Sequence, residues 1–233
     1  IIHNKLVFQK YNIEFKTSER PKLKLKLKKI NNYVKEQVNK ITDNVLIVGA
    51  SSGIGFDVLN ILKFNKRIKI LSTYNKNKIN LNNKNIKKIK IDLAKNIYKI
   101  KKILKKYSPL IIYYFATPKI NINLNDQNSM QVYKKFYIDF PLKIISFSQN
   151  REIKFFYPST VFASRTETSN YTKAKRYGEI ILNKANKRNI KINICRIDEI
   201  NTKQNLSILD RNLPNFRDLL NKNQFYQKKF FFI

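Results

Sequence analysis

From residue 44 onward, short apolar runs alternate with longer segments in which apolar residues recur every three or four positions. The short runs have the length of buried strands, and the longer segments have the period of amphipathic helices. This alternation predicts an α/β fold with a doubly wound parallel sheet in three α/β/α layers. The predicted strands are Val45–Val48, Ile68–Ser72, Ile86–Ile91, Leu110–Phe115, Ile153–Tyr157 and Ile190–Arg196. The predicted helices are Ile54–Phe64, Ile97–Lys106, Ser129–Ser148 (which Pro141 would kink) and Tyr171–Asn186.

The first 42 residues lack this alternation and are predicted to form an extension outside a domain of residues 43–233. Leu6–Phe15 has the pattern of a strand. Lys22–Lys28 alternates lysine and leucine, which fits a half-buried strand and a solvated linker equally well. One interpretation of the extension is the tail of an upstream module. A short amphipathic helix before the first core strand is predicted from the helical spacing of Ile30, Val34, Val38 and Ile41.

Composition narrows the functional classes. The chain has 233 residues, of which 42% are hydrophobic, enough for one packed domain with a short appendage. One Cys excludes an internal disulfide, and one His leaves little for a metal site. Cys195 is interpreted as a small buried hydrophobe and His3 as incidental. No apolar run reaches the roughly 18 residues of a membrane span and no secretory signal is visible, so a cytoplasmic location is expected.

The formal net charge of +33 would by itself suggest nucleic acid or an anionic surface as a partner. The lysines are spread over nearly every segment and mixed with Asn and Ile, however, a bias expected from an adenine/thymine-rich genome. The aromatic residues lie mostly in apolar runs. We therefore disfavour nucleic-acid binding, and expect the charge to favour anionic ligands in a salt-sensitive manner.

Glycine is scarce in this chain and concentrated in one place. Of the 4 glycines, three lie in Gly49-Ala50-Ser51-Ser52-Gly53-Ile54-Gly55, directly after the first predicted strand. Gly49 is assigned to the tight turn, Gly53 to close approach of a diphosphate, and Gly55 to packing of the next helix on the sheet. Backbone N–H groups and the positive end of that helix would hold the phosphates. An ordinary strand-to-helix turn is the alternative, but the concentration of glycine favours a Rossmann-like dinucleotide site.

The spacing Gly-x-x-x-Gly-x-Gly resembles the fingerprint of the short-chain dehydrogenase/reductase family. That family's catalytic signature, a Ser about a dozen residues before Tyr-x-x-x-Lys, is matched by Ser159, Tyr171 and Lys175. The resemblance covers about residues 44–233. Two other pairs have the same spacing but do not follow a strand-end serine, namely Tyr74/Lys78 and Tyr98/Lys102.

Helix geometry gives the catalytic spacing a physical meaning. Positions four apart share a helix face, so Lys175 would lie beside the Tyr171 phenol. An unperturbed phenol has a pKa of about 10, and a neighbouring cation lowers such a value by roughly 1–3 units. We therefore expect Tyr171 to act as the general acid–base. The resemblance implies that Lys175 also holds the nicotinamide ribose and that Ser159, or alternatively Thr160, hydrogen-bonds the substrate oxygen.

The segment after the second predicted strand favours NADP(H). A carboxylate there would select NAD by binding the ribose 2′-hydroxyl, but none occurs between Asp57 and Asp92. Lys76 offers positive charge for a 2′-phosphate, although a solvated lysine is an equal alternative. No metal ligand is predicted. The predicted cofactor-binding residues, several of them implied by the resemblance, are Gly49, Ser51, Ser52, Gly53, Ile54, Gly55, Thr73, Asn75, Lys76, Asp92, Leu93, Ala116, Lys175 and Thr202.

Some positions depart from the family pattern. Phe115-Ala116-Thr117 replaces Asn-Ala-Gly, and Ile197-Asp198 replaces Pro-Gly. Asp139 is the nearest counterpart of an asparagine that supports the family's proton relay. Asn205–Lys229 would supply a substrate loop, and Phe230–Ile233 is a candidate final strand.

The resemblance implies NADP(H)-dependent reduction of a small-molecule carbonyl to an alcohol, with a 3-oxoacyl thioester as the preferred substrate, by a homo-oligomeric enzyme. Two alternatives stay open. One is a sugar-nucleotide epimerase or dehydratase on the same fold, and the other is a non-catalytic nucleotide-binding module.

Overall fold

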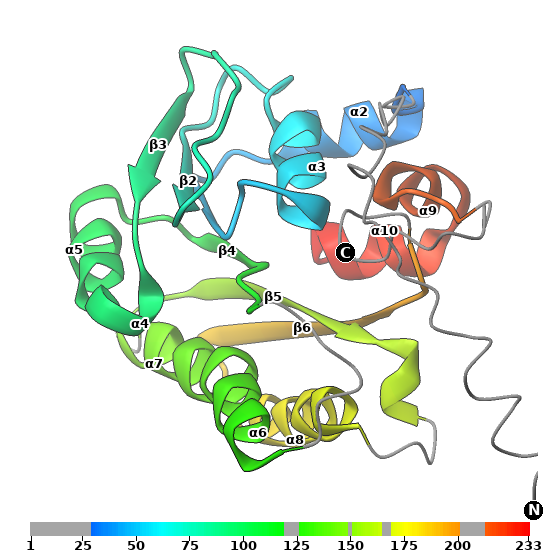
Figure 1. The fold of residues 1–233 in the computed structure, drawn as a ribbon. Helices are drawn as coiled ribbons and strands as arrows, with labels where there is room; N and C mark the ends of the chain where they lie inside the picture. The colour runs from blue at the N-terminus through cyan, green and yellow to red at the C-terminus, as the bar shows by residue number, and fades with distance from the viewer. Residues whose placement is uncertain (1–28, 119–125, 149–150, 165–168, 201–212) are drawn as a thin grey trace, which may run out of the picture.

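The computed structural model describes residues 29–118, 126–148, 151–164, 169–200 and 213–233. Their core is a six-stranded parallel sheet of order β3-β2-β1-β4-β5-β6 with helices on both faces, which confirms the predicted fold class (Figure 1). The order reverses between β1 and β4, and sheets of this type bind ligands beyond the strand ends at such a point. The strands are β1 (Val45–Val48), β2 (Ile70–Tyr74), β3 (Ile86–Lys90), β4 (Ile111–Tyr114), β5 (Ile153–Thr160) and β6 (Ile190–Ile197).

Two helical layers cover the sheet, each over its own apolar cluster. Successive residues of β1 serve the two clusters in turn, because strand side chains alternate between faces, and so all four of its residues are apolar and buried. One layer holds α2 (Asn32–Lys40), α3 (Gly53–Leu62), α9 (Phe216–Lys222) and α10 (Gln224–Phe231). The other holds α4 (Leu93–Asn96), α5 (Tyr98–Tyr107), α6 (Gln127–Lys134), α7 (Phe140–Ser146) and α8 (Asn170–Lys184).

The predicted helix over residues 129–148 is divided by a widened turn. A π-helical segment, η1 (Lys135–Asp139), joins α6 to α7, and the N–H of Phe140 donates to Lys135 O. Pro141 has no N–H to donate to the carbonyl of Tyr137 four residues earlier. Two phenols from the sheet donate to the carbonyls of this turn instead: Tyr157 to Tyr137 O at 3.0 Å and Tyr114 to Phe136 O at 2.7 Å. The proline therefore reshapes the helix where it faces the strand ends.

The predicted helix of the N-terminal extension is confirmed as α2, with Val34 and Val38 buried. It packs in the same apolar cluster as α3 and α9. Asn31 and Asn221 add two hydrogen bonds of 2.9 Å between its start and α9. The domain boundary at residues 42 and 43 stays a prediction, and Leu6–Phe15 and Lys22–Lys28 lie outside the described residues.

The C-terminal segment corrects one sequence prediction. Phe230–Ile233 is not a strand, because α10 continues to Phe231 and Phe230 packs fully buried against Tyr113, whose phenol donates to Phe230 O at 3.0 Å. The described part of the predicted substrate loop includes α9 and most of α10, whose buried apolar residues belong to the same cluster as those of α2 and α3, and its role in substrate binding stays a prediction. Residues 201–212, including Thr202, lie outside the described part of the chain.

One partly buried carboxyl group in this layer gives the fold a pH dependence. Burial raises the pKa of Asp57 in α3 from 3.8 to about 6, against the opposing effect of Arg217 in α9. Between those pH values the folded protein keeps a proton that the unfolded chain has released, so this carboxyl makes the fold less stable as pH rises. Asp57→Asn should remove that dependence. Urea unfolding of both proteins should show their stability difference changing by up to about 3 kcal/mol between pH 4 and 7, in favour of the variant at pH 7.

Candidate active site

The carboxyl ends of the strands open into a cleft of about 930 Å³. The structure brings most of the predicted site together here. Among the described residues, every predicted cofactor residue except Asp92 lines the cleft, as do Ser159, Tyr171 and Lys175, while Thr202 lies outside the described part of the chain. The glycine turn and the end of β2 form one side. The end of β5 and the start of α8 form the other.

The glycine turn has the backbone and the space that a diphosphate requires. Gly49 and Gly53 have positive φ values of 87° and 57°. A Cβ at Gly49 would lie 2.6 Å from Ala116 N, and a Cβ at Gly55 would overlap the carbonyl oxygen of Gly49. At Gly53 a Cβ would meet nothing within 4 Å, so the backbone there faces open space. Gly49 and Gly55 are thus needed for packing within the turn, and Gly53 leaves room for a ligand.

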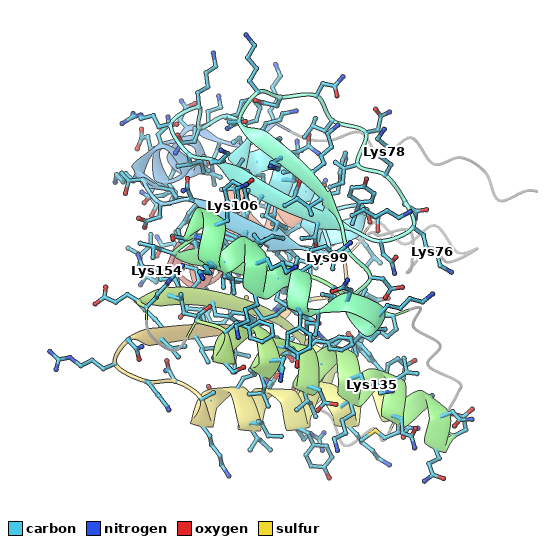
Figure 2. The ribbon with its side chains drawn as sticks, turned by 90° about the vertical axis from the view of Figure 1, so that its left-hand side faces the viewer. Lys76, Lys78, Lys99, Lys106, Lys135 and Lys154 are labelled. Atoms are coloured by element: carbon cyan, nitrogen blue, oxygen red, sulfur yellow. The ribbon has the colours of Figure 1, made fainter. Side chains whose placement is uncertain are left out.

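The end of β2 supports the turn and forms the rim of the cleft. The Thr73 hydroxyl is buried and accepts the N–H of Gly49 at 3.0 Å, so its role in the structure is to hold the turn. Asn75 and Lys76 are exposed at the rim. Figure 2 shows Lys76 and Lys78 on the segment between β2 and β3, where Lys76 but not Lys78 lines the cleft.

The predicted cofactor-binding residues Asp92 and Leu93 have different roles in the structure. Asp92 is the N-cap of α4, and its carboxylate accepts the N–H of Ala94 at 3.0 Å. It does not line the cleft, whereas the buried Leu93 does. At this end of the cleft, beyond β3, the side chains of Ile91 and Leu93 present apolar surface to a ligand.

The predicted catalytic side chains meet at the end of β5. Ser159 is 5% exposed, and its hydroxyl oxygen has no hydrogen-bond partner among the described residues. The neighbouring Thr160 hydroxyl hydrogen-bonds the Tyr171 phenol. A buried hydroxyl without a partner costs free energy, and at the wall of a cleft it is a group that a bound ligand can satisfy.

The predicted effect of Lys175 on the Tyr171 phenol is wrong for this structure. Burial raises the pKa of Tyr171 to about 12, and the hydrogen bond from Thr160 opposes that rise only partly. The Lys175 ammonium donates to the carbonyl of Pro158 at 2.6 Å instead of to the phenol. The prediction failed because it used helix spacing alone and could not include the burial of the phenol.

Lys175 itself is almost fully buried, at 6% exposed. Burial lowers its pKa from 10.5 to about 7, and the charge of Glu179 one helical turn later works in the opposite direction. The Glu179 carboxylate is held by Arg196 of β6 in a two-point ion pair, with 2.7 Å between Nη2 and Oε2. Lys175 thus supplies a readily titrated amine at the base of the cleft.

The sequence analysis chose the wrong residue of η1 as the counterpart of the family's relay asparagine. Asp139 is exposed and lies away from the cleft lining. Tyr137, two residues earlier, is buried and lines the cleft, and its phenol lies 2.6 Å from the Thr117 hydroxyl. Pro141 was the available signal, since a proline frees the carbonyl four residues before it and so marks the turn that faces the sheet.

The end of β6 closes the cleft with Ile197, Asp198, Glu199 and Ile200. Asp198, which stands at the altered Pro-Gly position, accepts a hydrogen bond from the Tyr226 phenol at 2.6 Å. Cys195 is buried, as expected of a small hydrophobe. Within the described ranges, no group of three His, Cys, Asp or Glu side chains could hold a metal, and no helix combines the length and apolarity needed to cross a membrane.

Neither a family model nor a curated protein matches this sequence. Solved structures do match its fold. One is a short-chain dehydrogenase family protein from Francisella tularensis, with a TM-score of 0.60 and 21% identity over 70% of this chain and 72% of that one. A second is a short chain dehydrogenase from Burkholderia cenocepacia in complex with NADP, with a TM-score of 0.63 and 10% identity over 74% of this chain and 78% of that one.

Epimerases are among the matching structures as well. UDP-glucose 4-epimerase from Thermotoga maritima has a TM-score of 0.56 and 19% identity over 66% of this chain. This chain spans only 54% of the epimerase's length. The protein therefore has the Rossmann fold that short-chain dehydrogenases and nucleotide-sugar epimerases share.

Proposed function

We propose that the protein is a nicotinamide-dependent oxidoreductase that reduces a small carbonyl compound to an alcohol, with NADP(H) as its cofactor. The observation that carries this proposal is the meeting, in one cleft, of an open glycine turn, an unpartnered buried serine hydroxyl and a Tyr–Lys pair on α8. A neighbour of the same fold binds NADP and others are dehydrogenases, which supports a nicotinamide cofactor.

The residues present fit such a cofactor. The turn at Gly53 has space and backbone N–H groups for a diphosphate, with the start of α3 adding positive potential. Lys175 would hold the nicotinamide ribose, and the apolar Ile91 and Leu93 would contact the adenine side. When bound, the reduced nicotinamide supplies a hydride.

The proton for the product alcohol would come from this chain. Because its pKa is about 12, the Tyr171 phenol keeps its proton at neutral pH, the state required of a general acid. The Ser159 hydroxyl would donate to the substrate oxygen as negative charge develops there, which satisfies an otherwise unpartnered group. The Thr160 hydroxyl orients the phenol. Net reduction then adds one hydride and one proton to the carbonyl.

A 3-oxoacyl thioester is our preferred substrate, and a panel of carbonyl compounds tests the proposal. We expect NADPH oxidation with at least one carbonyl substrate and binding of NADPH in its absence. Binding of NADPH without turnover of any carbonyl would favour the non-catalytic nucleotide-binding module instead. Failure of NADPH and NADH to bind would contradict both.

The second candidate is epimerisation or dehydration of a nucleotide sugar, which the epimerase neighbours favour. Such an enzyme uses its nicotinamide catalytically, so no net NADPH is consumed. Incubation with UDP-sugars followed by product analysis separates the two candidates.

Cofactor selectivity gives a prediction at the rim. Lys76→Ala should weaken NADPH binding about fivefold to tenfold and leave NADH binding unchanged, because only NADPH carries a 2′-phosphate for the ammonium to contact. Isothermal titration with both cofactors measures this. Lys78→Ala is the matched control, since Lys78 lies on the same exposed segment but outside the cleft lining and should change neither affinity. If both variants lost the same NADPH affinity, the effect would come from the lower net charge and not from a contact with the 2′-phosphate.

The two helices beside the active site also support the predicted homo-oligomer. Tyr177 and Ile180 of α8 and Val132 of α6 are 52%, 47% and 42% exposed. These apolar side chains lie on helices that pack against each other. We propose that this surface pairs with a second copy of the chain.

A further inference from the structure

A buried ammonium needs favourable contacts on all sides, and Lys175 has an unusual set of them. Its one hydrogen bond within the described part of the chain goes to Pro158 O. Glu179 lies one helical turn after Lys175, but its carboxylate forms the two-point ion pair with Arg196 and no hydrogen bond to Lys175 within the described residues. Other groups must therefore make the remaining favourable contacts with the ammonium.

Two phenol rings supply them. The Nζ atom of Lys175 lies 4.1 Å from the ring centroid of Tyr137 and 4.8 Å from that of Tyr157. Both distances are well inside the range of about 6 Å at which a cation is attracted to a ring face, and such contacts strengthen when water is excluded. The ammonium is thus held between an aromatic pair and one carbonyl.

The Tyr137 ring is fixed in this position from several directions. Its carbonyl, released by Pro141, accepts the Tyr157 phenol, and its own phenol is bonded to the Thr117 hydroxyl. It also meets the Tyr171 ring edge-on, with 5.6 Å between the centroids. Gly178 makes this arrangement possible, because a Cβ there would lie 2.7 Å from both Tyr137 O and the Tyr157 phenol oxygen.

We propose that Tyr137 is a positioning residue whose ring holds the Lys175 ammonium at the base of the cleft, ready for the cofactor. This inference rests on the proposed function for its catalytic consequence but not for the contact itself. It assigns to an aromatic face the task of orienting the lysine. The phenol hydroxyl of Tyr137 is secondary, because it binds Thr117 and not Lys175.

The test compares Tyr137→Leu, which removes the ring, with Tyr137→Phe, which removes only the hydroxyl. In protein labelled with ¹³C-lysine, the Cε signal of Lys175, identified by its loss in Lys175→Met, should lie upfield of the other lysines through ring currents. The shift should persist in Tyr137→Phe and shrink in Tyr137→Leu. In carbonyl reduction, Tyr137→Leu should lower kcat/KM about tenfold or more, and Tyr137→Phe should recover most of that loss.

The pH dependence of the same signal adds a second readout. The groups that face Lys175 are Glu179 and Tyr171 of α8, Tyr137 of η1 and Tyr157 of β5, with Arg196 of β6 behind Glu179. Tyr137→Leu removes the ring together with its hydroxyl, so the pKa of Lys175 should fall by about one unit, since the ring favours the charged form. In Tyr137→Phe, which keeps the ring, that pKa should stay close to its native value.

An unchanged Lys175 signal in Tyr137→Leu would overturn the proposal, and so would equal losses of kcat/KM in the leucine and phenylalanine variants. Circular dichroism and thermal unfolding check that each variant is folded. The lysine signal needs neither cofactor nor substrate. If it behaves as expected while no carbonyl is reduced, the aromatic contact stands and only the proposed function fails.

Discussion

Tyr171→Phe is expected to lower kcat for carbonyl reduction by roughly 10²–10⁴-fold, the usual contribution of a positioned general acid. The substitution removes the phenolic proton at the cleft, and it leaves the ring that packs against Tyr133 and Tyr137. Steady-state kinetics with NADPH and the best substrate of the carbonyl panel measure the loss. NADPH affinity, measured by titration, should stay within about twofold, because the contacts of the glycine turn are untouched.

A control for this experiment comes from the sequence itself. Tyr98 and Lys102 repeat the Tyr-x-x-x-Lys spacing on α5, where Tyr98 is 57% exposed and is not among the residues that line the cleft. Tyr98→Phe should leave kcat unchanged. Retention of full activity by Tyr171→Phe would rule out the phenol as the acid, and Thr160 or Ser159 would then have to be tested in that role.

Substitutions in the glycine turn should separate folding from cofactor binding. Gly53→Ala places a methyl group in open space, so we expect a loss of only about 1–2 kcal/mol from the positive φ of 57°. The same methyl group would stand where the diphosphate approaches, so NADPH affinity should fall at least tenfold. Thermal unfolding and NADPH titration on one protein preparation measure both effects.

Gly55→Ala should affect both properties together. Its methyl group would overlap the carbonyl oxygen of Gly49, so the turn or α3 must move, at a cost of about 1–3 kcal/mol or more. We expect a lower unfolding temperature than for Gly53→Ala and weak NADPH binding. If Gly53→Ala bound NADPH as tightly as the native protein, the diphosphate would not lie over this turn.

The sequence predicted the framework of the fold because its signals are local. The four apolar residues Val45–Val48 match β1, and Ile86–Ile91 differs from β3 only at its end. Glycine scarcity made the turn after β1 conspicuous, and its geometry follows from sterics that any chain must obey. Parallel pairing then brings the ends of β1, β2, β4 and β5 to one edge, which gathers residues as distant as Gly53 and Tyr171.

What the sequence did not predict depends on tertiary contacts. The raised pKa of Tyr171 follows from burial, which helix spacing does not contain. The position of Tyr137 depends on two phenols, from β4 and β5, that donate hydrogen bonds to carbonyls which lack a helical N–H donor. Phe230 looked like a strand residue, but the apolar surface around Tyr113 and Phe216 holds it in a helix. Local propensity is weak against such packing.

The most direct test of the account is a crystal structure of the protein with NADPH. It should place the diphosphate over Gly53 and the nicotinamide ribose within hydrogen-bond distance of Lys175, with the reactive face of the ring toward Ser159 and Tyr171. A nicotinamide located away from the end of β5, or a diphosphate bound elsewhere than the glycine turn, would contradict the proposed oxidoreductase function.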